Sequence, residues 1–316
     1  MDASIIIVNW NTKELLRDCL TSIFEHAGDI DYEVIVVDNA SMDDSVEMLK
    51  NDFRNVVLIE NTDNRGFAAA NNQAMAVAKG RYVLLLNSDT VVLENCIANV
   101  VKFADANPKA GVVGCRVLNS DRTLQPTCFM FPSILNMLLS STYLYKLFPK
   151  NRFFGRENMT WWDANNVREV DVVRGCFMLV RREAIEQVGV MDEQFFMYGE
   201  ETDWCYRFKK KGWKVVFAPV GEIIHFGGAS SKIVKFEMIR QLRSSILLFM
   251  KKNRNRIAYV TACLLVALFF FLRIPYWLCH AVYSKETRAQ DIQMTRVYAS
   301  SFFRSLLGWQ ALCSAK

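Results

Sequence analysis

Gly80-Arg81-Tyr82-Val83-Leu84-Leu85-Leu86-Asn87-Ser88-Asp89-Thr90 is the stretch that decides the fold. Its apolar run Val83–Leu86, placed between a glycine and a polar cluster, is typical of a strand buried on both faces of a parallel sheet. Ligands of such α/β sheets bind beyond the carboxyl ends of the strands, where Asn87, Ser88 and Asp89 follow. A carboxylate there suits Mg²⁺ or Mn²⁺ held jointly with substrate phosphates. An Asp that caps the next helix explains the turn alone equally well.

Three earlier segments repeat the pattern of an apolar strand, a polar turn and a helix. Apolar runs at Ser4–Val8, Tyr32–Val37 and Val56–Glu60 each precede a polar turn and a segment of helical periodicity. Strands and helices in this alternation predict an α/β fold with a mostly parallel, doubly wound sheet. Turn chemistry and helix capping explain any one of the polar turns. All of these polar turns together, at the same edge of the predicted sheet, favour a binding site for a polar ligand with sugar and phosphate groups.

The order of four motifs resembles family 2 glycosyltransferases of the GT-A fold, a Rossmann-like architecture, and is closest to their bacterial rhamnosyltransferase-like branch. The motifs are Ile6–Asn11, Val36–Ser41, Asn64–Ala68 and Leu85–Asp89. The resemblance implies that the first two loops hold the base and ribose of a nucleotide-sugar and that the Arg-Gly loop flanks this donor. The implied donor-binding residues are Asn9, Trp10, Asn11, Asp38, Asn39, Ser41, Arg65, Gly66, Asn87, Ser88 and Asp89.

The turn Asn87-Ser88-Asp89 corresponds to the D-x-D-like turn of that family, whose last Asp binds the metal on the diphosphate. The resemblance therefore implies Asp89 as a ligand of a divalent metal, Mn²⁺ or Mg²⁺. Asn87 removes one carboxylate from the turn. We expect a weaker dependence on metal than in enzymes with a complete D-x-D turn.

A second block, Tyr198-Gly199-Glu200-Glu201-Thr202-Asp203-Trp204, contains three carboxylates at the start of a predicted helix. The helix dipole explains at least one of them, and a general base is the alternative. Crowded carboxylates raise each other's pKa. The block is similar to the family motif Gly-Glu-Asp-x-Asp, which implies Glu201 as the catalytic base, with Glu200 or Asp203 as candidates to share this role. The predicted acceptor-side and supporting residues are Arg174, Asp192, Glu200, Asp203 and Trp204.

A single histidine, His225, follows the predicted strand Trp213–Ala218 and Pro219. A lone histidine after a strand is more often a packed or capping residue than a metal ligand. Its sequence context is similar to the family motif His-x-x-Gly-x-Ser, which implies His225 as the second metal ligand. Gly227 and Gly228 would let the backbone approach phosphate oxygens closely. The less periodic stretch 119–169 is predicted to be an insertion or an acceptor-facing loop region.

Composition limits the class of protein and its partners. The chain has 316 residues and a formal net charge of +5, and its basic residues cluster beside apolar sequence. This favours an anionic membrane surface over nucleic acid as a partner. Nine cysteines without a C-x-x-C pair or a His/Cys ligand spacing indicate a reducing cytosol. Because the core-like run Ser4–Val8 begins so early, we expect no cleavable signal peptide before it.

The C-terminal part predicts membrane association. The basic segment Lys251–Arg256 precedes the apolar run Ile257–Leu272, which is shorter than the roughly 20 residues that span a bilayer. A spanning helix, an interfacial helix and the core helix of an oligomer are the alternatives, and Arg273 and Pro275 favour the interfacial one. Residues 286–313 predict an amphipathic helix that lies on the membrane or mediates homodimerisation. The predicted domains are 1–250, the glycosyltransferase domain, and 251–316, the membrane-associated helical extension.

The sequence thus predicts an inverting, metal-dependent hexosyltransferase at the cytoplasmic face of the plasma membrane, attached peripherally or by a single C-terminal span. The resemblance implies transfer of L-rhamnose from dTDP-L-rhamnose to a hydroxyl of a lipid-linked saccharide, in O-antigen, capsule or cell-wall biosynthesis. A UDP-sugar donor and a non-catalytic membrane scaffold remain alternatives. A nucleotidyltransferase is disfavoured, because Asn9–Thr12 is not the glycine-rich basic loop that such an enzyme would carry after its first strand.

Overall fold

The computed structural model describes residues 1–227, 235–284 and 287–313. Its internal contacts form two compact units. Unit 1 comprises Met1–Phe131, Trp162–Phe196 and Glu200–Lys232, and unit 2 comprises Pro132–Trp161, Met197–Gly199 and Ile233–Lys316. By contacts, residues 132–161 therefore belong with the C-terminal helices. The sequence domains 1–250 and 251–316 stay a prediction.

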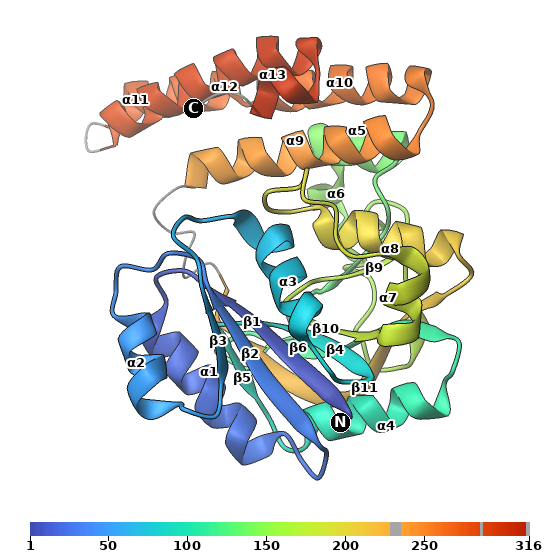
Figure 1. The fold of residues 1–316 in the computed structure, drawn as a ribbon. Helices are drawn as coiled ribbons and strands as arrows, with labels where there is room; N and C mark the ends of the chain where they lie inside the picture. The colour runs from blue at the N-terminus through green and yellow to red at the C-terminus, as the bar shows by residue number, and fades with distance from the viewer. Residues whose placement is uncertain (228–234, 285–286, 314–316) are drawn as a thin grey trace. The chain divides into compact units, whose positions relative to one another are not determined.

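Unit 1 is organised around a nine-stranded sheet of order β3-β2-β1-β4-β10-β6-β11-β5, with β8 paired to β11 (Figure 1). β1 pairs in parallel with β2 and β4, and β2 pairs in parallel with β3, whereas β10 is antiparallel to β4 and β6. The predicted mostly parallel, doubly wound sheet is confirmed. Its strands are β1 (Ala3–Asn9), β2 (Tyr32–Asp38), β3 (Val57–Glu60), β4 (Tyr82–Asn87), β5 (Thr90–Val92), β6 (Ala110–Leu118), β8 (Arg168–Glu169), β10 (Phe177–Arg181) and β11 (Lys214–His225).

Helices cover both faces of this sheet. One face of the central strands packs on apolar side chains of α1, α2 and α4, such as Leu20, Leu49 and Val100, to form a continuous core. The helix α3 contacts β1 and β2 and contributes alanines to the interior, which lets it lie close to the strands. The helices of unit 1 are α1 (Lys13–His26), α2 (Ser45–Asp52), α3 (Gly66–Val77), α4 (Cys96–Ala106), α7 (Arg182–Val188) and α8 (Glu200–Lys210).

The strand register gathers the polar ends of three strands at one edge. Asn9, the last residue of β1, lies opposite Asp38, the last residue of β2. On the other side of β1, Val8 lies opposite Asn87 at the end of β4. The apolar interiors of these strands are buried and so fix the register, because a slip of one residue would turn every side chain to the opposite face. The predicted common polar edge is confirmed.

The segment that ends in His225 differs from its prediction. β11 is one strand that continues past Pro219 as far as His225, so the predicted end at Ala218 is wrong. Its pairing with β6 is irregular between Phe217 and Glu222, and such a bulge tolerates a residue that cannot donate to the ladder. The short strand β5 pairs antiparallel with the end of β11 and sets His225 opposite Thr90.

The stretch 119–169 is more regular than its sequence indicates. Leu118 and Leu124 form an isolated antiparallel bridge, so the chain turns back on itself directly after β6. β7 (Cys128–Phe129) pairs antiparallel with β9 (Val172–Val173) in a separate two-stranded sheet. Two helices of unit 2, α5 (Ile134–Ser141) and α6 (Leu144–Leu147), follow.

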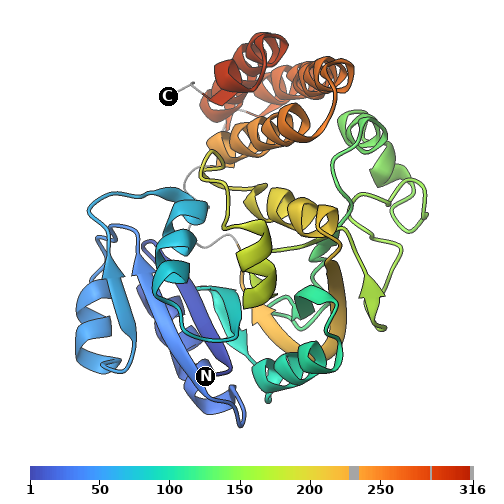
Figure 2. The same cartoon turned by 45° about the vertical axis from the view of Figure 1, so that its right-hand side comes forward.

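Unit 2 is helical, and both views show α9 and α10 running side by side (Figures 1 and 2). α10 also packs on α5 and α12, with a T-shaped contact between Phe270 and Tyr298 at 5.5 Å. The predicted apolar run is helical as α10, and the predicted amphipathic segment forms two helices, α12 and α13. The remaining helices are α9 (Lys235–Asn253), α10 (Arg256–Phe271), α11 (Ile274–Tyr283), α12 (Arg288–Leu307) and α13 (Trp309–Cys313).

Candidate active site

Asp38 holds together the two loops that follow β1 and β2. Its Oδ2 accepts a hydrogen bond from Asn9 Nδ2 at 2.9 Å, and its Oδ1 accepts one from the Ser41 N–H at 2.8 Å. Ser41 Oγ accepts in turn from the Asn9 side chain at 3.1 Å and from the Asn11 N–H at 2.9 Å. Asp38 is 2% exposed. The structure therefore brings four of the predicted donor-binding residues, Asn9, Asn11, Asp38 and Ser41, into one hydrogen-bond network that fixes the shape of both loops.

Thr12 connects this network to the turn after β4. Its Oγ1 donates to Asn9 Oδ1 at 2.7 Å and lies 2.8 Å from Ser88 Oγ. Because the Thr12 hydroxyl has one proton and Asn9 Oδ1 can only accept, the Ser88 hydroxyl donates to Thr12. Thr12 was not among the predicted site residues. A hydroxyl side chain at the start of a predicted helix is common in ordinary helix caps and so does not indicate a site.

The Arg-Gly loop reaches the same edge through Asn39. Asn39 Nδ2 donates to Asn64 Oδ1 and to the Gly66 carbonyl, both at 3.3 Å. Gly66 has a φ of +81°, and a Cβ atom at this position would lie 2.4 Å from the Phe196 carbonyl oxygen. Only glycine fits both the backbone conformation and the close approach. Arg65 is exposed beside it.

Asp89 and His225 lie together although they are far apart in the sequence. His225 Nε2 is 3.2 Å from Asp89 Oδ1 and 3.2 Å from Asn87 Nδ2. Both Asp89 and His225 are mostly buried, at 8% and 6% exposed. The β5–β11 pairing produces this proximity, because the Phe226 N–H also donates to the Asp89 carbonyl at 3.0 Å.

Gln125 completes the surroundings of His225, and the sequence analysis missed it. Gln125 Oε1 lies 2.6 Å from His225 Nδ1, and its Nε2 donates to the His225 carbonyl at 3.2 Å. Gln125 follows the turn beyond β6, in a stretch whose periodicity gave no signal. Its role depends on the pairing of β6 with β11, which brings the two segments side by side.

Glu201 and Asp89 both influence the buried thiol of Cys176. Burial raises the pKa of the Cys176 thiol to about 12; the positive charge of Arg174 opposes this rise, and the charges of Asp89 and Glu201 add to it. The charges of Arg174, Asp89 and Glu201 therefore each act on this one buried thiol of unit 1. Glu201 is half-buried in the first turn of α8, where a carboxylate interacts favourably with the helix dipole.

The other predicted supporting residues have identifiable structural partners. Asp203 is 1% exposed and accepts from Arg207 Nε at 2.8 Å, while Arg207 also donates to the Val188 and Val190 carbonyls. Trp204 is fully buried and donates to the Gly189 carbonyl at 2.8 Å. Asp192 accepts a hydrogen bond from the Gln194 N–H at 2.9 Å. The guanidinium carbon of Arg174 lies 4.9 Å from the centroid of the Phe129 ring. Glu200 is buried, at 4% exposed.

The donor set of Asp89 and His225 fits a divalent cation. A carboxylate oxygen and an imidazole nitrogen within 3.2 Å of each other can share one positive charge, and both are accepted ligands of Mn²⁺. Across residues 1–227, 235–284 and 287–313, no three His, Cys, Asp or Glu side chains are arranged to hold a metal. Substrate oxygens would therefore complete such a site, as is usual for a cation bound with phosphates. Gly227 has a φ of +64°, while Gly228 and the rest of the predicted His-x-x-Gly-x-Ser motif lie outside the described residues.

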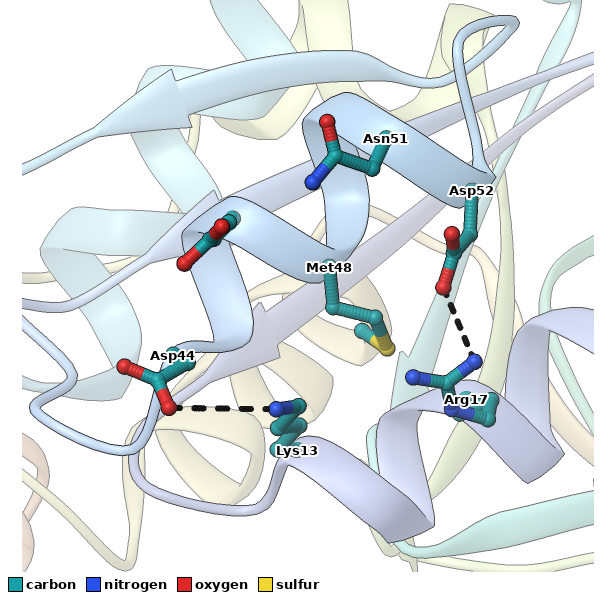
Figure 3. A pocket seen from close by; sticks show the side chains of 7 residues that line it. Lys13, Arg17, Asp44, Met48, Asn51 and Asp52 are labelled. Carbon is teal, nitrogen blue, oxygen red and sulfur yellow. Dashed lines mark hydrogen bonds and ion pairs between the residues drawn. The ribbon is translucent and has the colours of Figure 1, made fainter.

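A hollow of about 250 Å³ lies between α1 and α2 (Figure 3). Its charged side chains pair with one another: Lys13 lies 3.9 Å from Asp44 and Arg17 lies 2.8 Å from Asp52. None of the predicted site residues lines it. The polar edge, rather than this hollow, is the candidate site.

Comparison with known proteins identifies the family. Residues 4–189, more than half of the chain, match the family described as Glycosyl transferase family 2. The chain belongs to glycosyl transferase family 2. The predicted family and its GT-A fold are thereby confirmed.

Curated relatives include rhamnosyltransferases. The chain is 28% identical over 203 residues to an N-acetylglucosaminyl-diphospho-decaprenol L-rhamnosyltransferase of Mycobacterium tuberculosis, covering 61% of this chain and 66% of that protein. It is 25% identical over 234 residues to the rhamnosyltransferase WbbL of Escherichia coli K12, covering 70% and 82%. It is also 25% identical over 283 residues to the low-salt glycan biosynthesis hexosyltransferase Agl10 of Haloferax volcanii, covering 86% and 84%. The match to the mycobacterial relative leaves about a third of that protein uncovered.

A solved structure supports the fold. The mannosyltransferase PcManGT from Pyrobaculum calidifontis, in complex with GDP-Man and Mn²⁺, aligns with a TM-score of 0.56 at 17% identity and covers 98% of this chain and 84% of that one. At this identity the likeness shows the fold alone. In open α/β sheets, ligands bind beyond the carboxyl ends of the strands, which is where the polar residues that end β1, β2 and β4 lie.

Proposed function

We propose that this family 2 glycosyltransferase transfers L-rhamnose from dTDP-L-rhamnose to a hydroxyl of a lipid-linked saccharide, with inversion at the anomeric carbon. The observation that carries the proposal is the approach of Asp89 to His225 at the edge where Asn9, Asp38 and Asn87 end their strands. The relatives named as rhamnosyltransferases support rhamnose, and the mycobacterial one supports a diphospho-lipid acceptor.

The chemistry is a single displacement that balances within the site. Glu201 accepts the proton of the acceptor hydroxyl as its oxygen forms a bond to the anomeric carbon. The bond between the anomeric carbon and the diphosphate breaks with its electron pair on the departing oxygen. A divalent cation held by Asp89 and His225 would supply positive charge against that departing diphosphate. Attack on the face opposite the leaving group inverts the configuration.

The network around Asp38 has a preparatory role in this reaction. Its hydrogen bonds fix the loops before the donor arrives, so less conformational freedom is lost on binding. Asn11 and Arg65 are exposed next to these loops, and Trp10 is half-buried. We assign these three side chains to contacts with the base, ribose or phosphates of a nucleotide.

The proposal also includes a membrane surface as a partner of unit 2. Residues 251–316 contain ten Lys and Arg but two Asp and Glu, and Lys251, Lys252 and Arg254 are exposed. Exposed apolar side chains beside exposed basic ones fit the interface of an anionic bilayer. Thirteen large apolar residues are exposed in this part: Ile257, Val260, Leu264, Phe271, Leu272, Tyr276, Leu278, Val282, Tyr283, Ile292, Phe303, Leu306 and Leu307.

Attachment to one leaflet fits unit 2 better than a span. Arg256–Tyr283 is long and apolar enough to cross a membrane by length and composition. The helix nevertheless contains Arg273, whose guanidinium donates to the Phe269 carbonyl at 2.6 Å and to the Ser141 carbonyl at 3.2 Å. A membrane-spanning helix would therefore draw the end of α5 into the hydrocarbon. It would also draw in α12, which packs on α10 and carries the exposed Arg288 and Arg296, and charged side chains are costly there.

Release of nucleoside diphosphate from a panel of sugar nucleotides tests the proposed activity. Detergent-purified protein is supplied with a lipid-linked saccharide acceptor and with Mn²⁺, Mg²⁺ or EDTA. We expect turnover of dTDP-L-rhamnose in the presence of metal. Turnover of a UDP-sugar instead of dTDP-L-rhamnose would show that the proposed donor is wrong and that the proposed reaction, glycosyl transfer, is right. Absence of both binding and turnover across the panel would favour a non-catalytic scaffold.

A further inference from the structure

Five side chains form a continuous chain of hydrogen bonds from the protein surface to His225. Thr123 Oγ1 donates to Asp121 Oδ1 at 2.6 Å, and Asn119 Nδ2 donates to Thr123 Oγ1 at 2.9 Å. Gln125 Nε2 donates to Asn119 Oδ1 at 2.8 Å, and Gln125 Oε1 lies 2.6 Å from His225 Nδ1. This chain of hydrogen bonds ends at the imidazole of His225, whose other nitrogen, Nε2, faces Asp89.

The ionised end of this chain determines the direction of every bond in it. Asp121 is exposed, and the hydroxyl and backbone N–H of Thr123 hold the pKa of its carboxyl below the usual value. An ionised carboxylate only accepts, so the single hydroxyl proton of Thr123 points to Asp121. Thr123 Oγ1 can then only accept from Asn119, which presents its amide NH₂ there and its carbonyl oxygen to Gln125.

The same logic assigns the Gln125 amide and the His225 proton. Because Asn119 Oδ1 is an acceptor, the Gln125 NH₂ faces it, and Gln125 Oε1 faces His225. A carbonyl oxygen 2.6 Å from an imidazole nitrogen requires a proton between them, and only the nitrogen can carry it. His225 Nδ1 is therefore the protonated nitrogen.

We propose that Gln125 is a positioning residue that holds His225 with its proton on Nδ1 and with a bare Nε2 lone pair directed at Asp89. The opposite tautomer would place two acceptors, Gln125 Oε1 and Nδ1, 2.6 Å apart. A flipped Gln125 amide would relieve that conflict only by setting two carbonyl oxygens, its own and that of Asn119, against each other at 2.8 Å.

The arrangement of Asp89 and His225 has a direct consequence. In this tautomer Nε2 and the carboxylate oxygen of Asp89, 3.2 Å apart, are two acceptors that face each other, and a shared cation would stabilise them. Asn87 Nδ2, 3.2 Å from Nε2, is the hydrogen-bond donor that the lone pair has in the absence of a cation. The inference thus rests on the metal site of the proposed function and explains how the imidazole is prepared for it.

The turn that carries the chain of hydrogen bonds is itself well defined. The Gln125 N–H donates to the Val117 carbonyl at 2.9 Å, and the Asn119 N–H donates to the Thr123 carbonyl at 2.8 Å. Arg122 adopts a φ of +63°, a left-handed conformation that closes the turn. Backbone pairing therefore fixes the two amide side chains before any ligand binds.

Long-range ¹H–¹⁵N correlation spectra of the full-length, metal-free protein labelled with ¹⁵N-histidine test the inference directly. The chain has three histidines, so a His225→Gln variant assigns the His225 signals. We expect a protonated Nδ1 and a bare Nε2. A proton on Nε2, on both nitrogens or exchanging between them would overturn the inference, whether or not the protein binds metal.

Two substitutions of Gln125 separate positioning from packing. Gln125→Met removes the acceptor, and we expect loss of the single tautomer and roughly 10- to 100-fold weaker Mn²⁺ binding, measured by electron paramagnetic resonance with the metal alone. Gln125→Glu keeps an acceptor at Nδ1 and should keep the proton there, but it loses the amide donor to Asn119 Oδ1, so we expect the affinity to be only partly recovered. The control is Gln187→Met, an exposed glutamine on α7.

The two proposals fail in distinguishable ways. A Gln125→Met protein that keeps the wild-type tautomer and Mn²⁺ affinity would overturn the positioning role of Gln125. A wild-type protein with the expected tautomer but without Mn²⁺ binding would support the positioning role and overturn the metal site of the proposed function instead.

Discussion

Asp89 Oδ1 lies 3.2 Å from His225 Nε2, across the junction of β5 and β11. The two residues are far apart in the sequence: Asp89 follows β4, and His225 is the last residue of β11 in the same sheet. The pair is mostly buried and lies at the sheet edge where the polar ends of β1 and β4 meet. The short turn that contains Asp89 and the histidine at position 225 therefore form one candidate site.

Asp89→Asn should abolish Mn²⁺ binding and lower kcat about 100- to 1000-fold, because the charge that offsets the leaving diphosphate would be lost. Isothermal titration with Mn²⁺ and steady-state kinetics measure the two effects. The matched control is Asp29→Asn, which changes an exposed carboxylate in the turn before β2 and should alter neither. Wild-type metal dependence in the Asp89 variant would contradict its assignment as a ligand.

Gly66→Ala should destabilise the Arg-Gly loop. The substitution adds a Cβ atom 2.4 Å from the Phe196 carbonyl oxygen to a backbone with a φ of +81°. We expect a loss of stability of roughly 1–3 kcal/mol and weaker binding of the nucleotide-sugar, measured by denaturant unfolding and by donor titration. Gly212→Ala is the control, because Gly212 has a φ of +86° with no atom within 4 Å of the added Cβ. Equal losses in the two variants would show that the contact with Phe196 is irrelevant.

Asp203→Asn should affect stability rather than chemistry. Asp203 is 1% exposed and pairs with Arg207 Nε at 2.8 Å, so the substitution removes the negative charge that this ion pair gives the Arg207 guanidinium. The expected cost is about 2 kcal/mol in the free energy of unfolding, with kcat of the folded protein within a few-fold of wild type. A fall of 100-fold or more in kcat without a change in stability would instead make Asp203 a general base, the alternative that the sequence left open.

The C-terminal helix α13 should remain on the same side of the membrane as unit 1. Within the described ranges, Cys279 and Cys313 are the two exposed thiols, so Cys279→Ser leaves Cys313 as the accessible probe there. We expect a membrane-impermeant maleimide to label Cys313 in inside-out vesicles and not in intact spheroplasts. Labelling from the outside only would show that Arg256–Tyr283 spans the bilayer.

Much of the fold of unit 1 could be predicted from the sequence. The apolar runs that became β1, β2 and β4 are fully buried strands, and alternation with amphipathic helices leaves few topologies for them. The common polar edge could be predicted as well, because the carboxyl ends of neighbouring parallel strands lie at the same edge of the sheet. The predicted end of a strand at Ala218 was wrong, since local sequence marks Pro219 as a breaker and does not reveal the irregular pairing that accommodates it.

The site could be predicted only in part. Motif resemblance selected Asp89, Glu201 and His225, and the fold brings Asp89 and His225 together. Gln125 and Thr12 could not be predicted, because each matters through a partner that the tertiary fold supplies: His225 in one case and Ser88 in the other. A polar side chain on a short turn looks the same in the sequence whether or not a distant strand brings a histidine to it.

The most direct test of the account is nucleoside diphosphate release by Glu201→Gln, compared with Glu186→Gln, a change at an exposed position on α7. With the lipid-linked acceptor and the donor that the wild type turns over, we predict a 100- to 10,000-fold fall in kcat for Glu201→Gln, because the acceptor proton loses its base. Donor binding should stay close to wild type, and Glu186→Gln should be unaffected. Wild-type turnover by Glu201→Gln would contradict the central claim that Glu201, Asp89 and His225 form one active site.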